Sequence, residues 1–358
     1  MSFDSFSGPS AKVDNVQIDS LVIMKLVKHV DSEFYSGMSD VAGEACQGIL
    51  TGLISPAEKR LEITNCFPTP RSELGVDGDD AAQSQQSYEE KQYETMEMLR
   101  RFRQMNIDYE VVGFYQAHLF GACYTEDMII SLAEYQANLT ESVVLVYDPV
   151  STRQGRLSIR ALRLSPKAFD LCQNTDWSPE IVKNSGVTFT NMLQELPVTI
   201  KNSRLMNVML AELKLLHPQR NEAHLELGTR NGLEKSLRSS ISVVEELNKT
   251  IGSYNKYTLE KQRYDAMLNT LIQKRQIENE ARQVRGEPKL SIDELKRQHK
   301  QPQLQTKSGM LELFLNCGDT EKYADYAAHM TAENISKLFI SEAAGQSGNV
   351  QVERETPL

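Results

Sequence analysis

The stretch from Val111 to Asp127, VVGFYQAHLFGACYTED, constrains the fold of this chain more than any other. Its β-branched and aromatic residues predict a buried strand over residues 107–118, with a histidine at its end. Thr125 or Glu126 then begins a helix whose apolar residues recur at helical spacing and which ends near Asn138. A strand that leads directly into a helix favours an α/β architecture.

The rest of the first half of the chain has the same alternation. Strands are expected near residues 13–18, 45–54, 61–66, 142–147 and 157–164, and helices near 20–30 and 88–105. Gly48 and Gly52 lie inside one of these strands and indicate a bulge or a close approach of another backbone. The pattern predicts an α/β sandwich of sheet and helices, followed by an extended all-helical C-terminal region.

Composition predicts the following division of the chain. It consists of a disordered N-terminus (1–12), an α/β domain (13–165) with a long acidic loop (68–87), a helical region (166–286), a polar linker (287–309), two or three short C-terminal helices (310–343) and a disordered tail (344–358). Thr331 is the expected cap of the last of these helices.

The helical region contains an apolar seam typical of a coiled coil or helix bundle, because its residues recur at intervals of three and four. The seam residues are Leu237, Ile241, Val244, Leu247, Ile251 and Tyr254, and Ile335, Leu338 and Phe339 share one face of the last helix. A single narrow helix cannot bury such a seam, so partner helices are expected. An intramolecular hairpin and a homotypic coiled coil remain as alternatives.

Charge and cysteine content exclude several classes of function. The formal net charge of −10 argues against a simple basic nucleic-acid-binding protein. The five cysteines are scattered without a CxxC pair, which favours a reducing compartment and supports neither a disulfide framework nor a structural zinc site. The N-terminus lacks a secretory signal, and no apolar run approaches the roughly 18 residues of a membrane span. A cytoplasmic protein without membrane contact is expected.

One local stretch is basic. Residues 260–300 contain ten Lys or Arg residues against seven acids, with little aromatic interleaving. A solvated helix face accounts for this pattern. The alternative is a peripheral contact with rRNA, which would be independent of sequence.

The end of the 107–118 strand suggests a metal site that has lost its ligands. Gln116 and His118 alternate along the strand and so face the same way, but a neutral amide is a poor zinc ligand. At this point the chain resembles the MPN family, whose catalytic members carry the JAMM zinc motif. The resemblance places Gln116 where the motif has its first histidine, His118 at the second, Glu126 at the serine and Ile129 at the aspartate. Glu44 roughly matches the early glutamate.

One histidine does not hold a catalytic zinc ion. The sequence therefore predicts neither a metal nor a cofactor, and no enzymatic activity. His118 is interpreted as a strand histidine with its hydrogen bonds satisfied. A JAMM-type metallo-isopeptidase whose ligands are completed by a partner chain is the rival from another class.

Several runs together resemble a narrower family, the h subunits of eukaryotic translation initiation factor 3. They are QGILTGL, RLEITNCFP, VGFYQ after NID, ESVVLVYDP, IKNSRLMNV, RGEP and ENISKLF, spread over most of the chain. The resemblance implies a non-catalytic MPN domain that pairs with a second MPN subunit, and helices that join PCI-domain subunits in a complex on the small ribosomal subunit. An MPN subunit of the proteasome lid or the signalosome shares this architecture and is the other alternative.

Overall fold

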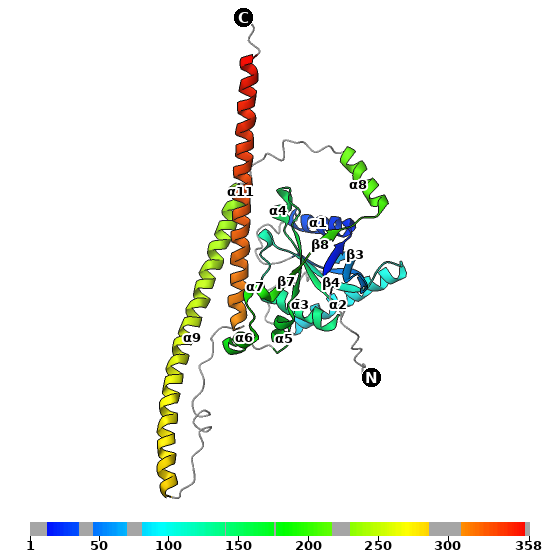
Figure 1. Ribbon diagram of the computed structural model, residues 1–358. Helices are drawn as coiled ribbons and strands as arrows, with labels where there is room; N and C mark the ends of the chain where they lie inside the picture. The colour runs from blue at the N-terminus through cyan, green and yellow to red at the C-terminus, as the bar shows by residue number, and fades with distance from the viewer. Residues whose placement is uncertain are drawn as a thin grey trace.

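The computed structural model describes residues 13–35, 46–69, 81–139, 141–174, 177–216, 230–285 and 309–354. The expected disordered N-terminus and, except for Gly309, the expected linker lie outside these residues. Figure 1 shows a body built around one sheet, with the long helices α9 and α11 packed side by side along it. Within the described residues, no helix is both long and apolar enough to cross a membrane.

The sheet has eight strands in the order β7-β6-β5-β4-β2-β3-β1-β8. Parallel and antiparallel pairs are mixed: β4 and β5 are parallel, whereas β2 is antiparallel to both of its neighbours. The strands are β1 (Asn15–Ile18), β2 (Cys46–Ser55), β3 (Arg60–Pro68), β4 (Val111–Ala117), β5 (Val143–Tyr147), β6 (Ile159–Leu164), β7 (Leu193–Leu196) and β8 (Val198–Ile200).

The two edge strands of this sheet are consecutive in the chain and are separated only by Pro197. Residues 193–196 pair with β6 at one edge, and residues 198–200 pair with β1 at the other. The carbonyl of Pro197 also accepts a hydrogen bond from the Val16 N–H, at 3.0 Å. One segment therefore joins both edges, so that the sheet rolls up and its edges are covered.

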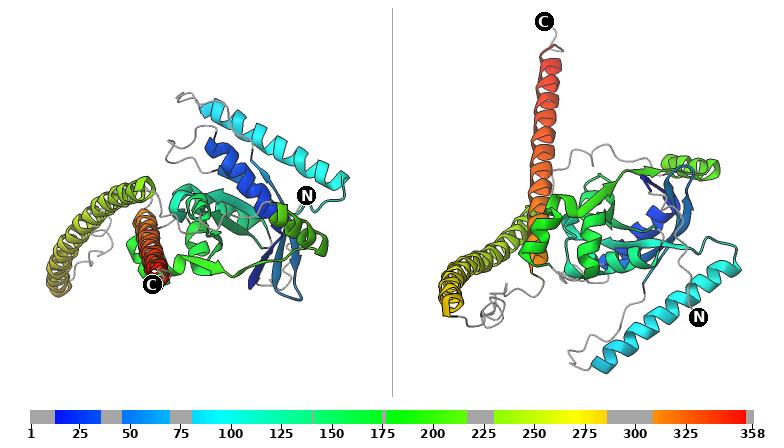
Figure 2. Two further views of the ribbon diagram at one scale, coloured as in Figure 1. Left: turned by 90° about the horizontal axis from the view of Figure 1, so that it is seen from above. Right: turned by 60° about the horizontal axis from the view of Figure 1, so that its bottom comes forward.

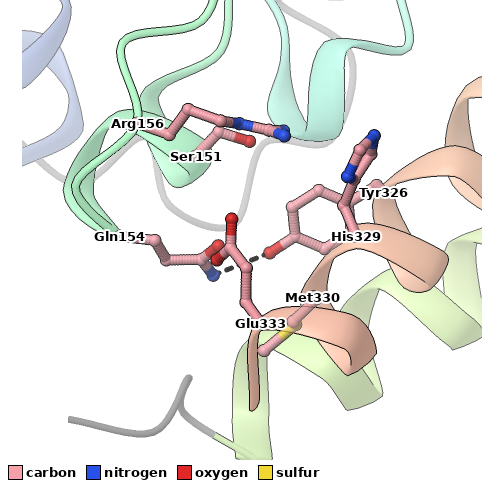
Figure 3. A pocket seen from close by; sticks show the side chains of 7 residues that line it. All are labelled: Ser151, Gln154, Arg156, Tyr326, His329, Met330 and Glu333. Carbon is pink, nitrogen blue, oxygen red and sulfur yellow. Dashed lines mark hydrogen bonds between the residues drawn. The ribbon is translucent and has the colours of Figure 1, made fainter. Parts of the chain in front are cut away.

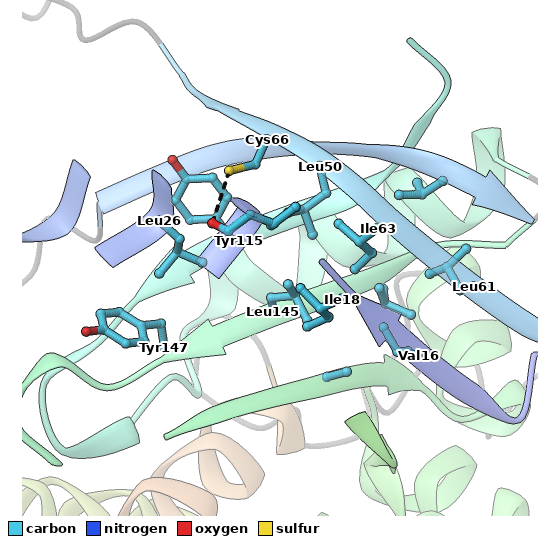
Figure 4. Packing of buried hydrophobic residues seen from close by; sticks show 14 of the residues in the cluster. Val16, Ile18, Leu26, Leu50, Leu61, Ile63, Cys66, Tyr115, Leu145 and Tyr147 are labelled. Carbon is cyan, nitrogen blue, oxygen red and sulfur yellow. Dashed lines mark hydrogen bonds between the residues drawn. The ribbon is translucent and has the colours of Figure 1, made fainter. Parts of the chain in front are cut away.

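Alternate residues of the central strands enter two different cores, as the pleat requires. Tyr115 and Leu145 point into the roll, where α1 (Ser20–Tyr35) covers them with Val22 and Leu26 (Figure 4). Phe114, Val144 and Val146 point outward, into a second core. That core also contains Leu311, Phe314 and Leu315 of α11 (Met310–Arg354), so the last helix completes the body.

Two glycines of β2 behave as the sequence predicts. The strand has a register shift between Thr51 and Gly52, and a Cβ atom at Gly52 would lie 1.9 Å from the Glu62 carbonyl oxygen. A Cβ atom at Gly48 would lie 2.3 Å from the ring of Tyr115. Both the predicted bulge and the predicted close approach are therefore present.

The remaining elements before β7 are helices around the sheet. They are α2 (Ala81–Gln104), the 3₁₀ turn η2 (Leu119–Gly121), α3 (Glu126–Asn138), α4 (Pro149–Arg153), α5 (Pro166–Asn174), α6 (Pro179–Ser185) and α7 (Phe189–Met192). Helix α3 begins and ends where the sequence predicts, with Thr125 as its cap. The acidic loop expected over residues 68–87 is shorter than predicted, because α2 already begins at Ala81.

The C-terminal half differs from the sequence prediction in two ways. The region expected to be entirely helical from residue 166 also supplies β7 and β8, which extends the sheet unit beyond the predicted boundary at 165. Its helices are α8 (Arg204–Leu216) and α9 (Arg230–Arg285), the latter with 56 residues.

The second difference concerns residues 310–354, where a single helix of 45 residues replaces the predicted short helices. It continues to Arg354, past the expected start of the disordered tail. Thr331 does not cap a helix, because its hydroxyl donates to the carbonyl oxygens of Ala327 and Ala328, at 2.7 and 2.9 Å, inside an uninterrupted turn.

The closing strand should be essential for stability. Leu196 lies in the inner core, so its replacement by alanine should lower the free energy of unfolding by roughly 2–5 kcal/mol, measured by urea unfolding. Glu195 is its exposed neighbour on the same strand, and Glu195→Ala should change stability by less than about 0.5 kcal/mol. An effect of Leu196→Ala as small as that of Glu195→Ala would show that the closing strand contributes little to stability.

Candidate functional site

The end of β4 carries the first two positions of the degenerate metal motif. Gln116 is buried on the strand, and His118, which is partly exposed, follows directly after the strand. The His118 Nε2 atom lies 3.1 Å from the Gln116 Oε1 atom, within hydrogen-bonding distance. The His118 backbone N–H donates to the Tyr147 carbonyl at 3.0 Å. The ring nitrogen that would have to bind a metal is therefore already paired with a protein oxygen.

The next two positions lie on α3 and are equally unsuited to a metal. Ile129, at the aspartate position, is buried in the outer core. Glu126, at the serine position, is exposed in the first turn of the helix, where a carboxylate is favoured by the helix dipole. Glu44, the early glutamate, lies outside the described residues.

A basic side chain stands beside this site. Arg160 of β6 donates from Nη2 to the Gly121 carbonyl oxygen at 2.7 Å. Burial, followed by the positive charge of Arg160, lowers the pKa of His118 to about 4. His118 is therefore neutral at physiological pH, and a metal cation in this position would be repelled by the guanidinium.

These residues do not fit the zinc ion of the JAMM motif. An amide, a single neutral histidine, an isoleucine and a nearby arginine cannot supply the three ligands of a catalytic zinc site. Across the described residues, no group of three or more His, Cys, Asp or Glu side chains could hold a metal ion. No catalytic step through a metal follows from this arrangement.

The loop after β4 has a different use, which is to receive α11. We call residues 118–124 the α11 socket. Phe120 adopts a left-handed φ of 61°, which is unusual for a bulky residue, and its N–H donates to Asp148 Oδ1 at 3.2 Å. Its ring packs on Tyr326 and Tyr323 of α11, with centroids 4.7 and 6.0 Å away.

A second part of the socket contacts an earlier part of α11. The Tyr124 N–H donates to Asp319 Oδ1 at 3.1 Å. Gly318 lies against the Tyr124 ring, so closely that a Cβ atom there would be 2.7 Å from a ring carbon. The N-terminus of the helix is also fixed, because the Met310 N–H donates to the Trp177 carbonyl at 3.0 Å. The first half of α11 is thus docked on the body by specific polar and apolar contacts.

A polar seam continues this contact along α4 (Figure 3). The Gln154 side-chain amide donates to the Tyr326 hydroxyl at 2.8 Å, and Arg156, His329 and Glu333 surround the same spot. The enclosed cavity measures only about 10 Å³, which is room for one water molecule and not for an organic ligand. The polar seam is a contact between α4 and α11 rather than a binding site.

Helix α9 lies against α11 with a face that overlaps the predicted apolar seam only in part. Leu233 packs against the cluster of Phe120, Tyr326 and Met330, and the buried residues of α9 are the small Ser236 and Thr250. Of the predicted seam, Leu247 and Tyr254 are half-buried on the same face as Ser236 and Thr250. The other four, Leu237, Ile241, Val244 and Ile251, are between 37% and 60% exposed. Most of the seam therefore forms a free apolar face on α9.

The far half of α11 is also uncovered. The C-terminal part of the helix projects away from the body in the direction opposite to the end of α9 (Figures 1 and 2). Ile335, Leu338 and Phe339, the three residues predicted to share a face, are each more than half exposed, as is the adjacent Ile340. The structure thus brings the two predicted groups onto neighbouring helices but covers neither.

Sequence analysis missed a further exposed surface on α8. All thirteen residues of this helix are at least partly exposed, and its apolar side chains Leu205, Val208, Met209, Leu213 and Leu216 recur at helical spacing. That periodicity is the signal that could have identified an apolar surface as well as a helix.

Two family descriptions match the chain. Residues 11–141 match the family described as JAB1/Mov34/MPN/PAD-1 ubiquitin protease, and residues 152–350 match the family described as the C-terminal region of eIF3h. The second match covers more than half of the chain. The chain belongs to the eIF3h family of translation initiation factor subunits. The α/β sandwich is accordingly an MPN domain, and the predicted family resemblance is confirmed.

Curated relatives extend this similarity over nearly the whole length. The chain is 57% identical to the H subunit of eukaryotic translation initiation factor 3 from Brugia malayi, over 95% of this chain and 94% of the relative. It is 51% identical to the protein of the same name from Caenorhabditis elegans, over 96% and 94%. Identity falls to 37% with the H-B subunit of the same factor from Danio rerio, over 92% and 93%. Membership of the family therefore rests on both halves of the chain.

The docking of α11 can be tested with two glycines. Gly318→Ala should loosen α11 from the socket, because the added methyl group overlaps the Tyr124 ring. The measurement is amide hydrogen exchange of the 118–126 and 310–330 peptides, where faster exchange is expected.

Gly252 provides a matched control, because it lies within α9 with open space around a Cβ atom. Gly252→Ala should leave exchange in the socket unchanged and stabilise the helix by roughly 0.5–1 kcal/mol. Unchanged socket exchange in the Gly318→Ala protein would contradict the close contact.

Proposed function

We propose that this protein is a non-catalytic scaffold subunit of translation initiation factor 3 in the cytoplasm. In this proposal the MPN domain pairs with a second MPN subunit, and the C-terminal helices bind PCI-domain subunits. The assembled complex then promotes initiation on the small ribosomal subunit. Family membership supports the complex, and the surfaces of the helices support the mode of assembly.

The observation that carries the scaffold role is the free apolar face of α9. Full burial of a leucine, isoleucine or valine side chain stabilises a folded or assembled state by roughly 1.5–3 kcal/mol. In the isolated chain much of this stabilisation is unused at four positions of α9, because their side chains are exposed: Leu237, Ile241, Val244 and Ile251. The intramolecular hairpin expected as an alternative is formed with α11, but of the seam it covers only Leu247 and Tyr254, each in part. The hairpin therefore does not remove the need for further helices.

Two other exposed apolar helices suit the pairing of MPN domains. Leu205 and Val208 of α8 are 80% and 64% exposed, and Tyr93 and Met96 of α2 are also exposed. A partner domain could cover these helices while leaving the α9–α11 pair accessible. The basic stretch from residue 260 lies partly on the projecting end of α9, where a peripheral rRNA contact remains the alternative to a solvated face.

The rival enzymatic function requires that a partner chain restores a zinc site at His118. We expect the complex, purified without chelators, to contain less than stoichiometric zinc bound to this protein, because Arg160 and Gln116 occupy the surroundings of the ring. Metal analysis of wild-type and His118→Ala complexes provides the measurement. Stoichiometric zinc that is lost in the variant would refute a purely structural role.

The apolar seam of α9 can be tested by adding charge. Val244→Asp together with Ile251→Asp should release the protein from its complex, because burying an unpaired carboxylate costs several kcal/mol. Both positions are exposed in the isolated chain, so its thermal unfolding should change little. Affinity purification followed by native mass spectrometry measures the loss.

The matched control places two aspartates on the polar side of the same turns. Ser242 and Ser253 lie on the opposite side of the helix from Val244 and Ile251 and are exposed and partly exposed, so Ser242→Asp with Ser253→Asp adds the same charge without touching the seam. This protein should assemble normally. If the Val244 and Ile251 double variant stays in the complex, the seam is not an interface. If purification recovers proteasome-lid or signalosome subunits instead, the protein belongs to another complex.

A further inference from the structure

The contact between α11 and its socket contains an ionisable group that the scaffold function does not use. Asp319, in the first half of α11, accepts the hydrogen bond from Tyr124, and its carboxyl is largely buried between the helix and the socket. The Tyr124 N–H satisfies one of its lone pairs. Among the described residues, no Lys, Arg or His side chain lies within ion-pair distance of it.

The basic groups nearby are engaged elsewhere. Arg160 of β6 donates to the Gly121 carbonyl, and Lys322 on the next turn of α11 lies 3.7 Å from Asp325. The remaining titratable groups around the socket are Cys123, Tyr124, Glu321, Tyr323, His118 and the buried Asp148, which accepts the Phe120 N–H. Burial raises the pKa of Cys123 and of Tyr124, so both are neutral at physiological pH.

We propose that Asp319 is a proton-controlled latch, which holds α11 in the socket when its carboxyl is protonated and weakens the docking when it is ionised. Releasing α11 would expose Phe120 and free the α9–α11 pair to move relative to the MPN domain. The latch depends only on contacts within this chain. It therefore goes beyond the proposed scaffold role and does not rest on it.

The direction of the pH dependence follows from linkage. Burial raises the pKa of Asp319 to about 7 in the docked state, against an ordinary value of 3.8 once the group is in water. Between these two values the docked state holds a proton that the released state loses. The docking constant therefore falls about tenfold for each pH unit from about 4 to about 7 and is constant above the docked pKa.

Hydrogen exchange of the full-length chain tests the latch. After correction for the intrinsic rate, protection of the 118–126 and 310–330 peptides in the wild type, divided by their protection in Asp319→Asn, should fall between about pH 5 and 7 and then level off. Asp319→Asn keeps the Oδ1 acceptor for Tyr124 but has no charge, so its protection has only the pH dependence of the other groups, such as His118 and Asp148. Peptides from β5, in the inner core, serve as the internal reference for hydrogen exchange at each pH.

Glu321→Gln is the matched control, because it removes an exposed carboxylate from the same helix and leaves the Lys322–Asp325 pair intact. Its pH profile should equal that of the wild type. His118 contributes with the opposite sign below its ordinary pKa of 6.5, since its pKa is lowered, and the ratio to Asp319→Asn cancels this contribution.

A ratio of wild-type to Asp319→Asn protection that is flat from about pH 5 to 7 would overturn the proposal. A Glu321→Gln protein that loses the same slope would also overturn it. A ratio to Asp319→Asn that falls with pH for both the wild type and Glu321→Gln is the supporting result.

Discussion

The docking of α11 on the body is the contact on which the rest of this structure depends. Leu311, Phe314 and Leu315 complete the outer core of the MPN domain, although they follow its last strand by more than a hundred residues in the chain. Because α11 is fixed there, α9 has a surface to pack on, and the two helices have a defined direction. Loss of this contact would therefore expose the outer core and leave the α9–α11 pair unattached.

The degenerate metal site makes that docking possible. A zinc site with an open position for water must keep its surroundings accessible to substrate. Here the Gln116 amide interacts with the histidine ring and Arg160 holds the Gly121 carbonyl, so the loop needs no metal to keep its shape. The loop can then present Phe120 to α11. The absence of metal ligands at the end of β4 and the covering of the adjacent loop by α11 both suit a site that serves as a docking surface.

Sequence patterns predicted the local features well and the long-range ones poorly. Strand β4, the Thr125 cap of α3 and the bulge at Gly52 follow from neighbouring residues, so they could be predicted. The closing segment at residues 193–200 was not assigned to the sheet, because strands of four and three residues carry little periodicity and their partners are distant in sequence. Arg160 belongs to no sequence motif, because it reaches the Gly121 carbonyl only through the folded position of β6 beside the socket.

The apolar seam of α9 shows why a hydrophobic pattern does not identify the partner of a helix. The pattern located a true surface, but α11 packs on an adjacent face, which Ser236 and Thr250 share with Leu247 and Tyr254. Small polar residues are absent from an apolar count, so periodicity joined Leu247 and Tyr254 to residues that the hairpin leaves exposed. Leu237, Ile241, Val244 and Ile251 therefore stay largely unburied within the chain. This exposed set is the physical basis of the proposal that helices of other chains cover α9.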